Sequence, residues 1–426
     1  MSQQAPSANE SPNASPPMKI GIAGLGFGAT EFLPALERTP QFQVVAGADI
    51  RPQALQAFQK RYAANGARVY DSVAALCADP DVEAIWIATP NQFHGEHALL
   101  ATQNGKHSVV RKPLATTIEE CERIVDLADK NGVKILGGGQ TQGTNALIQH
   151  VRRMIVTNEL GPLRAINLWA FTGWMLRPRM AQEVDDAMGG GIVWRQAPHQ
   201  LETVRWLGGG KVRSVRAITG RWRPERPNGT GYFTALLEFE DGTPATIVYN
   251  AYGYFDSVEL VKWGNDKDAA QRAKWRQQLL NGEMPEEKLK EATRFGGMVE
   301  GDDEPKIPWE AGRAVVTSGG QWLPGNQGFF IVSLDAGDVR AAPDGLYVYD
   351  NAGMREVPIA SKRGEGMAFM DEEAMELYNA VRHNKPMLHD ARWGMATAEV
   401  QWAILESAKQ RKEIMLRHQS GVPAGL

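Results

Sequence analysis

Short apolar runs alternate with amphipathic stretches along the N-terminal part of the chain. The apolar runs are KIGIAG, QVVAGAD, EAIWIAT, HSVV and VKILGG. Nearly continuous apolar strands separated by helical spacing are typical of a parallel βα sheet. Ser72 and Thr117 each precede an amphipathic stretch, where a hydroxyl can cap a helix N-terminus. The pattern therefore predicts an α/β domain with a parallel sheet over residues 18–139.

The pattern changes after residue 139. Apolar residues recur at helical spacing over Thr144–Val156 and Gly189–Leu207, which predicts two helices. Strands are predicted for VRAITGRW, YFTALLEFE, ATIVYNAYG and DSVELVKW, with Asp241-Gly242 as a hairpin turn. Because consecutive strands joined by tight turns are antiparallel, residues 140–426 are expected to form an α+β domain with a mainly antiparallel open sheet.

An insert of about residues 265–326 interrupts this second domain. Its first half is charge-dense with helical spacing, and its second half is rich in Gly and Pro. Two amphipathic helices, MDEEAMELYNAVRHN and ARWGMATAEVQWAILESAKQ, and a short strand, EIML, are predicted to close the domain.

Composition excludes several classes of partner. With 46 basic and 50 acidic residues the net charge is -4, so no basic field is available to hold nucleic acid. No run approaches the roughly 18 uncharged apolar residues of a membrane span. Residues 1–17 are rich in Ser, Pro, Asn, Gln and Ala, which predicts a disordered tail rather than a signal peptide. We expect a cytoplasmic protein that binds neither nucleic acid nor a membrane.

A dinucleotide-binding motif lies between the first predicted strand and helix. The residues from Gly24 to Ala29 read GLGFGA, which fits GxGxxA. Gly24 permits the tight turn, Gly26 lets the backbone approach a pyrophosphate, and Ala29 lets the helix pack closely on the sheet. The motif predicts a Rossmann domain whose phosphate-binding residues are Gly24, Gly26, Phe27, Gly28 and Ala29. The alternative is a purely structural glycine turn.

Asp49 supports the dinucleotide interpretation. It ends the second predicted strand, where a carboxylate accepts hydrogen bonds from the adenosine ribose hydroxyls and favours NAD. Arg51 leaves NADP open, because its guanidinium can pair with a 2′-phosphate. Asp49 would repel that phosphate, so NAD is the expected cofactor and NADP the alternative.

Further motifs follow the later strands of this domain. They are Thr89-Pro90-Asn91 with His94, Gly105-Lys106-His107, and Arg111-Lys112-Pro113. Together they resemble the Gfo/Idh/MocA oxidoreductases, and the resemblance extends through the GGG-led helix at Gly189 and the C-terminal helices. It implies that this edge of the sheet holds the cofactor, with contacts from Thr89, Pro90, Asn91, His94, Arg111 and Lys112.

Lys112 is the first candidate catalytic residue. In the family the matching lysine is the catalytic acid or base, and it lies at the carboxyl end of a strand, where such sheets bind ligands. Burial and a cationic nicotinamide would lower its pKa toward the working pH. The alternative is a solvated surface lysine. Arg111 stands where the family has Glu, which removes a carboxylate beside Lys112 and adds a cation. We expect the Lys112-Pro113 peptide to be cis.

His199 is the second candidate. It matches the family's catalytic histidine, able to hydrogen-bond or deprotonate a substrate hydroxyl. Arg195 stands four residues earlier, where relatives carry Asp, and this spacing predicts both side chains on one helix face. His94 and His107 are expected to have structural roles near the cofactor. No metal site is predicted, because the histidines lack ligand spacing and carboxylates do not cluster with them.

The second domain suggests an anionic ring as substrate. Arg195, Trp174 and Arg177 are predicted to bind it, since guanidinium groups suit carboxylates and flat aromatics suit planar rings. Arg195 is the best candidate to pair with a ring carboxylate. Trp194 and Trp222 lie in the same segments. A solvated surface position is the alternative interpretation for most of the arginines in these segments, which are Arg177, Arg179, Arg221, Arg223 and Arg226. Within the family, the stretches ATPNQFHGEHALLA, GWMLRPRM and GGGIVWRQAPHQ resemble the phthalate 4,5-cis-dihydrodiol dehydrogenases.

This finer resemblance implies an NAD-dependent oxidation of a carboxylated cyclic cis-dihydrodiol, phthalate 4,5-cis-dihydrodiol to 4,5-dihydroxyphthalate, in aromatic degradation. Two alternatives remain open: a sugar or inositol dehydrogenase of the same family, and a non-catalytic NAD-sensing protein. The family resemblance also implies a homodimer or homotetramer assembled through the face of the second-domain sheet.

Overall fold

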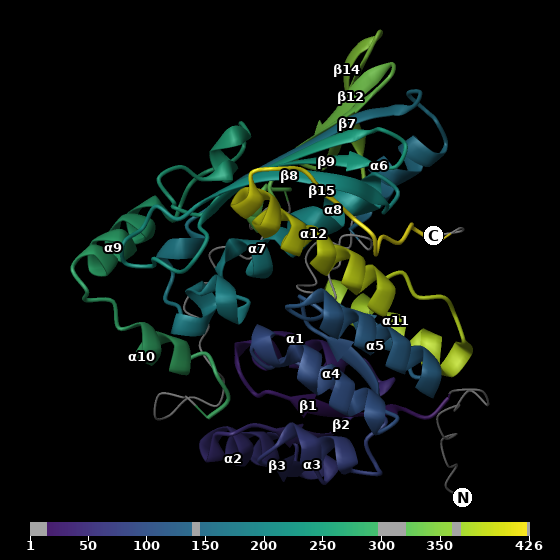
Figure 1. Cartoon of the computed structure of the whole chain (residues 1–426), viewed down its shortest axis with the longest axis vertical. Helices are drawn as coiled ribbons and strands as arrows, with labels where there is room; N and C mark the ends of the chain where they lie inside the picture. Colours follow the sequence, from purple (N-terminus) through teal and green to yellow (C-terminus); the bar gives the residue numbers. More distant parts are fainter. Residues whose placement is uncertain (1–14, 139–144, 297–320, 360–367, 424–426) are drawn as a thin grey trace, which may run out of the picture.

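A computed structural model describes residues 15–138, 145–296, 321–359 and 368–423. Most of the predicted disordered tail, residues 1–14, lies outside the described residues. The described chain forms two sheets with helices packed around and between them (Figure 1). The first sheet is formed by the N-terminal part of the chain. The helices α8 (Ala197–Leu207) and α12 (Ala391–Gln410) lie between this part and the second sheet.

The first sheet has six parallel strands in the order β3-β2-β1-β4-β5-β6. Its strands are β1 (Met18–Ala23), β2 (Phe42–Ala48), β3 (Arg68–Tyr70), β4 (Ala84–Ile87), β5 (His107–Val110) and β6 (Ile135–Gly137). The connecting helices are α1 (Phe27–Arg38), α2 (Pro52–Arg61), α3 (Val73–Ala78), α4 (His94–Gln103) and α5 (Ile118–Asn131). The predicted caps are confirmed: the hydroxyls of Ser72 and Thr117 accept from the backbone N–H groups of Ala75 and Glu120. This is the doubly wound parallel sheet predicted from the sequence.

The second sheet has nine strands in the order β14-β13-β12-β11-β7-β10-β9-β8-β15. Its strands are β7 (Leu163–Phe171), β8 (Val212–Gly220), β9 (Tyr232–Phe239), β10 (Pro244–Asn250), β11 (Phe329–Leu334), β12 (Gly337–Ala341), β13 (Gly345–Asp350), β14 (Gly353–Pro358) and β15 (Ile414–Met415). β7 and β10 are parallel, and the other neighbours are antiparallel. The predicted class, α+β with a mainly antiparallel sheet, is confirmed, and Gly242 has the positive φ of the predicted hairpin turn.

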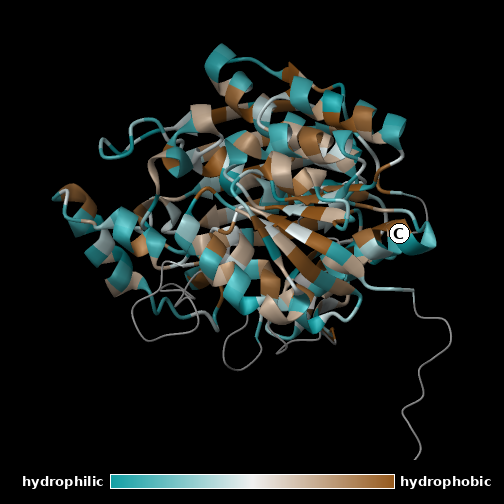
Figure 2. Ribbon diagram, turned by 90° about the horizontal axis from the view of Figure 1, so that it is seen from below, coloured by the Kyte–Doolittle hydropathy of each residue, from teal (hydrophilic) through white to brown (hydrophobic). Residues whose placement is uncertain are grey.

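Helices α8 and α12 cover one face of this sheet. The remaining helices after β6 are α6 (Ala146–Val156), α7 (Gly191–Arg195), α9 (Ala269–Leu280), α10 (Glu286–Glu291) and α11 (Ala368–His383). Figure 2 shows hydrophobic residues gathered on the strands and hydrophilic residues on the outer helices. Buried side chains of α8, such as Leu201 and Val204, pack against Phe233 and Ile247 of the sheet in one apolar core.

The end of the chain returns to the first domain. Leu377 and Tyr378 of α11 are buried in the core that contains Ile20 and Phe32. A β-bridge joins Leu136 in β6 to Asp390, the residue that caps α12. The C-terminal helices therefore pack against both domains: α11 against the first, and α12 against both β6 and β8.

The structure corrects two predicted elements. The single helix over Gly189–Leu207 is wrong, because α7 ends at Arg195 and α8 begins at Ala197. Pro198 stands in the first turn of α8, where its missing N–H costs nothing at a new helix start but would break a continuous helix. The strand predicted for DSVELVKW is also wrong: Ser257–Leu260 is a short 3-10 helix capped by Asp256.

Candidate active site

The glycine-rich loop joins β1 to the N-terminus of α1. Gly24 has a φ of 88°, and a Cβ there would lie 2.9 Å from the Thr89 backbone nitrogen. A Cβ at Gly26 would meet nothing within 4 Å, so the backbone is open to a ligand at this point. The first N–H groups of α1 are directed at the same space. The loop fits the diphosphate of a dinucleotide, which its backbone N–H groups and helix dipole would hold.

Asp49 follows β2 and faces this loop. Its carboxylate accepts from the Leu25 N–H at 2.8 Å and from the Arg51 N–H at 2.9 Å. The Arg51 guanidinium also contacts Asp49, at 3.1 Å, and Glu291 of α10, at 3.3 Å. Arg51 is thus held by two carboxylates, and the Asp49 carboxylate lies against the glycine-rich loop.

The loop that follows β4 in the first domain contacts the second domain. Asn91 donates to the Gly189 carbonyl at 2.7 Å, and Pro90 begins the short 3-10 helix Asn91–Phe93. His94 is buried, with its ring nitrogens 2.7 Å and 2.8 Å from the Pro113 and Thr89 carbonyls. Burial lowers the pKa of His94 to about 4. His94 therefore fastens the loops after β4 and β5 to each other, which agrees with a structural role beside the cofactor.

Lys112 lies two residues beyond β5, at the carboxyl edge of the parallel sheet. The Lys112-Pro113 peptide is cis, as predicted. The Lys112 Nζ donates to the backbone carbonyl of Arg195, so the amine points toward the second domain. Burial lowers the pKa of Lys112 well below its usual value, and the charges of Arg195 and Arg111 lower it further. A neutral amine in this position can accept a proton.

Arg111 has carboxylate partners that the sequence did not reveal. Its guanidinium lies 3.5 Å from Glu31 of α1 and 3.5 Å from Glu373 of α11. Glu31 acts on Lys112 as well, since its charge opposes the lowering of the Lys112 pKa. Two carboxylates from distant helices thus stand near the position where the family motif carries a single Glu.

His199 lies in the first turns of α8 and is partly buried. Among the described residues, no side chain is within hydrogen-bond distance of its imidazole. Burial lowers the pKa of His199 well below its usual value, and the nearby charges of Lys112 and Arg111 act in the same direction. His199 is therefore neutral at physiological pH, and it is close enough to Lys112 for the two groups to interact electrostatically.

The Arg195 guanidinium takes part in an ionic cluster around Glu183. It pairs with Glu183 at 2.9 Å, and Glu183 also pairs with Lys290 of α10 at 2.9 Å and with Arg179 at 3.9 Å. We call these four residues the Glu183 cluster. Burial opposes ionisation of Glu183, but the charges of Arg195, Lys290 and Arg179 outweigh it and hold the pKa of this carboxyl well below its usual range. Because the predicted helix is broken between them, Arg195 and His199 do not share a helix face, which corrects that expectation.

Trp174 is buried beneath the Arg179 guanidinium, which lies 3.8 Å above its ring. The Arg177 side chain beside it is partly exposed. In the described part of the chain, no carboxylate lies within ion-pair distance of the Arg177 guanidinium. Burial lowers the pKa of Arg177, while Tyr249 and Asp256 oppose the shift. An arginine stays protonated under such conditions, so Arg177 is a cation available to a ligand.

A chain of hydrogen bonds runs from Lys112 through Gln196 to Tyr249, whose charge acts on the pKa of Arg177. Gln196 donates to the same Arg195 carbonyl that Lys112 contacts, at 3.0 Å. The Tyr249 hydroxyl of β10 donates to the Gln196 side chain at 3.4 Å. Gln196 and Tyr249 were not predicted, because neither carries a motif and their pairing joins residues 53 positions apart.

Glu202 also lies on α8, but it is buried and structural. Its carboxylate accepts from Trp393 at 2.8 Å and contacts His389 at 3.0 Å. His389 contacts Glu376 of α11 on its other side, at 2.7 Å. Glu202 is shielded from solvent because α12 covers this face of α8.

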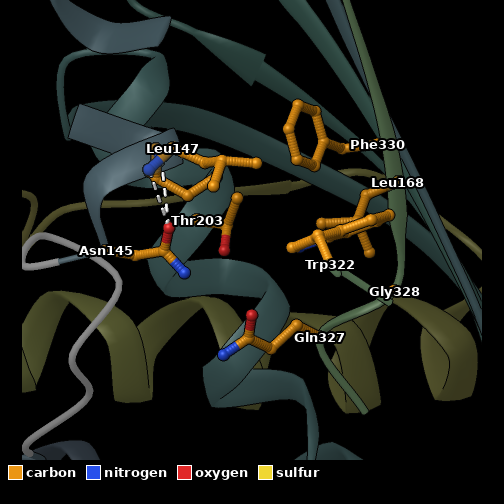
Figure 3. A pocket seen from close by; sticks show the side chains of 9 residues that line it. Asn145, Leu147, Leu168, Thr203, Trp322, Gln327, Gly328 and Phe330 are labelled. Atoms are coloured by element: carbon orange, nitrogen blue, oxygen red, sulfur yellow. Dashed lines mark hydrogen bonds between the residues drawn. The ribbon is translucent and has the colours of Figure 1, made fainter. Parts of the chain in front are cut away.

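A pocket borders α8 one turn beyond His199 (Figure 3). It is lined by Asn145, Leu147, Ile148, Leu168, Thr203, Trp322, Gln327, Gly328 and Phe330. The Thr203 hydroxyl donates to the His199 carbonyl at 3.2 Å. None of the lining side chains is charged, so this pocket alone does not fit an anion.

The described residues contain no group of three or more His, Cys, Asp or Glu side chains that could hold a metal ion. Within the same residues, no helix is both long and apolar enough to cross a membrane.

Two family models match the chain. Residues 18–138 match the model described as "Oxidoreductase family, NAD-binding Rossmann fold", and residues 148–266 match the "GFO/IDH/MocA C-terminal domain". The two matches cover the first sheet and the part of the second domain that carries Arg177, Arg195 and His199.

Known proteins match over most of the chain. The 1-carboxy-3-chloro-3,4-dihydroxycyclohexa-1,5-diene dehydrogenase of Comamonas testosteroni is 30% identical, covering 92% of this chain and 95% of the relative. A putative dehydrogenase from Bordetella bronchiseptica is 31% identical, with a TM-score of 0.78, and covers 94% of this chain and 100% of that structure. The WlbA dehydrogenase from Bordetella pertussis, solved with NADH and UDP-GlcNAcA, shares the fold at 21% identity, with a TM-score of 0.63 and coverage of 94% and 99%.

Proposed function

Because the chain belongs to the Gfo/Idh/MocA oxidoreductases, a family of NAD(P)-dependent dehydrogenases, we propose that it oxidises a carboxylated cyclic cis-dihydrodiol with NAD⁺. The expected substrate is phthalate 4,5-cis-dihydrodiol, and the product is 4,5-dihydroxyphthalate. The Comamonas relative is named for a ring of a similar kind, with a carboxylate, a chlorine, two hydroxyls and two double bonds.

The proposal is supported most directly by the Arg177 guanidinium. It is a cation without a carboxylate partner among the described residues, and Tyr249 and Gln196 link its surroundings to Lys112. A carboxylate on the ring would fill the place of the missing partner through a charge-assisted hydrogen bond. The Arg195 guanidinium, by contrast, is already paired with Glu183. Arg177 is therefore the stronger candidate for a substrate carboxylate.

Lys112 and His199 act on the substrate hydroxyl that is oxidised. When bound, the nicotinamide supplies the acceptor for a hydride from the hydroxyl-bearing carbon. Lys112 accepts the proton of the hydroxyl on that carbon, and the burial that lowers its pKa favours the neutral amine that this step needs. The neutral imidazole of His199 orients the hydroxyl. The resulting ketone tautomerises to the aromatic diol, and the gain of aromaticity draws the reaction forward.

A substrate panel tests the proposal. The full-length protein is mixed with NAD⁺ and either phthalate 4,5-cis-dihydrodiol, an uncharged benzene cis-dihydrodiol, or myo-inositol, and NADH formation is followed by absorbance. We expect the highest kcat/KM with the dicarboxylated diol. Faster oxidation of inositol would favour the polyol dehydrogenase alternative, and no turnover with any diol or polyol would favour the NAD-sensing one. Repeating the panel with NADP⁺ tests the preference that Asp49 predicts.

A further inference from the structure

Part of the predicted insert packs directly on the dinucleotide-binding loop. We call residues 286–296, which comprise α10 and the turn that follows it, the α10 segment. The Phe295 N–H donates to the Leu25 carbonyl at 3.2 Å, and the Thr30 hydroxyl donates to the Thr293 carbonyl at 3.2 Å. Phe295 is buried against Phe58 of α2, with ring centroids 6.0 Å apart. The segment is thus joined to both ends of the glycine-rich loop.

The same segment is tied to the second domain by ion pairs. Glu286 at its start pairs with Arg226 at 2.9 Å and accepts from the Arg179 N–H at 2.6 Å. Lys290 pairs with Glu183 at 2.9 Å. These contacts hold the α10 segment between the substrate domain and the glycine-rich loop.

Lys290 is the side chain of this segment best placed for an anionic ligand. Its Nζ lies 5.7 Å from the centre of the Phe27 ring, and Phe27 is the first residue of α1. Burial lowers the pKa of Lys290 to about 8 and Glu183 opposes this shift, so the amine is charged at pH 7. Glu183 also has Arg195 and Arg179 as partners and does not depend on Lys290 alone.

We propose that the α10 segment completes the cofactor site, and that Lys290 supplies a cation for the diphosphate of the bound dinucleotide. The diphosphate belongs at the N-terminus of α1, where Gly26 leaves the backbone open and Lys290 stands beside Phe27. A lysine is a suitable point charge for a phosphate, and a buried one is little screened by salt. The proposal rests on the dinucleotide and is independent of which diol is oxidised.

NADH titrations of the full-length protein at pH 7, followed by fluorescence, test this assignment without turnover. We expect Lys290→Met to raise the Kd of NADH about tenfold, and Lys290→Arg to restore most of the affinity. Lys288→Met, an exposed lysine on the same short helix, is the matched control and should leave the Kd unchanged. Thermal unfolding of each variant shows whether the fold is intact.

Competing ligands distinguish the diphosphate from other anions. ADP-ribose should lose about the same tenfold affinity in Lys290→Met as NADH does, whereas AMP, which has no diphosphate, should lose little. Unchanged NADH and ADP-ribose affinities would overturn the proposal. If they are unchanged while the KM of a carboxylated diol rises, the cation serves the substrate instead. Equal losses for AMP and ADP-ribose in a folded variant would also overturn the assignment to the diphosphate.

Discussion

The glycine-rich loop and the Glu183 cluster lie next to each other but are built in different ways. The loop depends on backbone geometry: Gly24 adopts a positive φ, Gly26 leaves open space, and the α1 N–H groups are directed outward. The cluster depends on long side chains from three segments that share one buried carboxylate. A site built from backbone geometry can be recognised in the sequence from a short motif. An ionic cluster forms only when distant segments fold together. Substitutions should therefore affect the two regions differently.

We expect the greatest loss of stability from a substitution in the Glu183 cluster. Glu183→Gln leaves one buried and two partly buried cations without their shared anion and should lower the free energy of unfolding by about 3 kcal/mol. Urea denaturation of the full chain measures this. Glu287→Gln, at an exposed position of α10, is the control and should change stability little. A loss for Glu183→Gln no larger than for the control would mean that the cluster does not stabilise the fold.

In the glycine-rich loop, a substitution should be able to weaken NADH binding without lowering the stability of the fold. Gly26 has a φ of -86° and no atom near its missing Cβ, so Gly26→Ala should change stability by less than about 0.5 kcal/mol. The added methyl group occupies the open space, and we expect the Kd of NADH to rise roughly a hundredfold. Gly24→Ala is the contrasting variant, because its positive φ should cost about 1–3 kcal/mol of stability. Unchanged NADH affinity in Gly26→Ala would place the diphosphate elsewhere.

A third test concerns the junction of the two domains. Although burial opposes it, contacts with Glu376 and Glu202 raise the pKa of His389 well above its usual value. His389 therefore contributes its full stabilisation below pH 6.5, and loses it as pH rises from there through the raised pKa, by up to about 1.4 kcal/mol per pH unit.

Comparison with His389→Gln isolates this contribution from the other titrating groups. The stability difference between the wild type and the variant, measured by urea denaturation from pH 6 to pH 9, should shrink as pH rises. A difference that stays constant over this range would show that His389 is not protonated in the folded protein.

The smallest of these effects is expected at Arg177. Arg177→Gln should raise the KM of a carboxylated dihydrodiol about fivefold and leave kcat nearly unchanged, since it removes a binding contact made equally in the ground and transition states. Steady-state kinetics measure both constants. Arg213→Gln, an exposed position on β8, serves as the control. An unchanged KM would exclude Arg177 from carboxylate binding.

The sequence predicted the features that depend on neighbouring residues. The GxGxxA loop, the Ser72 and Thr117 caps, the cis Lys112-Pro113 peptide and the Asp241-Gly242 turn are local, and the structure contains each of them. The family resemblance added the expected roles of Lys112 and His199.

The features that were missed are pairings between distant residues. Arg111 was taken to have lost its carboxylate partner, yet it lies beside Glu31 and Glu373, the second of which is 262 residues away. Lys290 and Glu183 are 107 residues apart, and no motif marks either residue. The break between α7 and α8 is signalled by Pro198 alone, which also fits a helix start, and so the orientation of Arg195 could not be predicted.

Lys112→Ala tests whether Lys112 accepts the substrate proton. With the diol that the wild type oxidises fastest, kcat should fall about 10²–10⁴-fold. The Kd of NADH should stay within about threefold of the wild-type value, because the glycine-rich loop that holds the dinucleotide is untouched. Near-normal turnover by a variant that still binds NADH would show that Lys112 is not the proton acceptor.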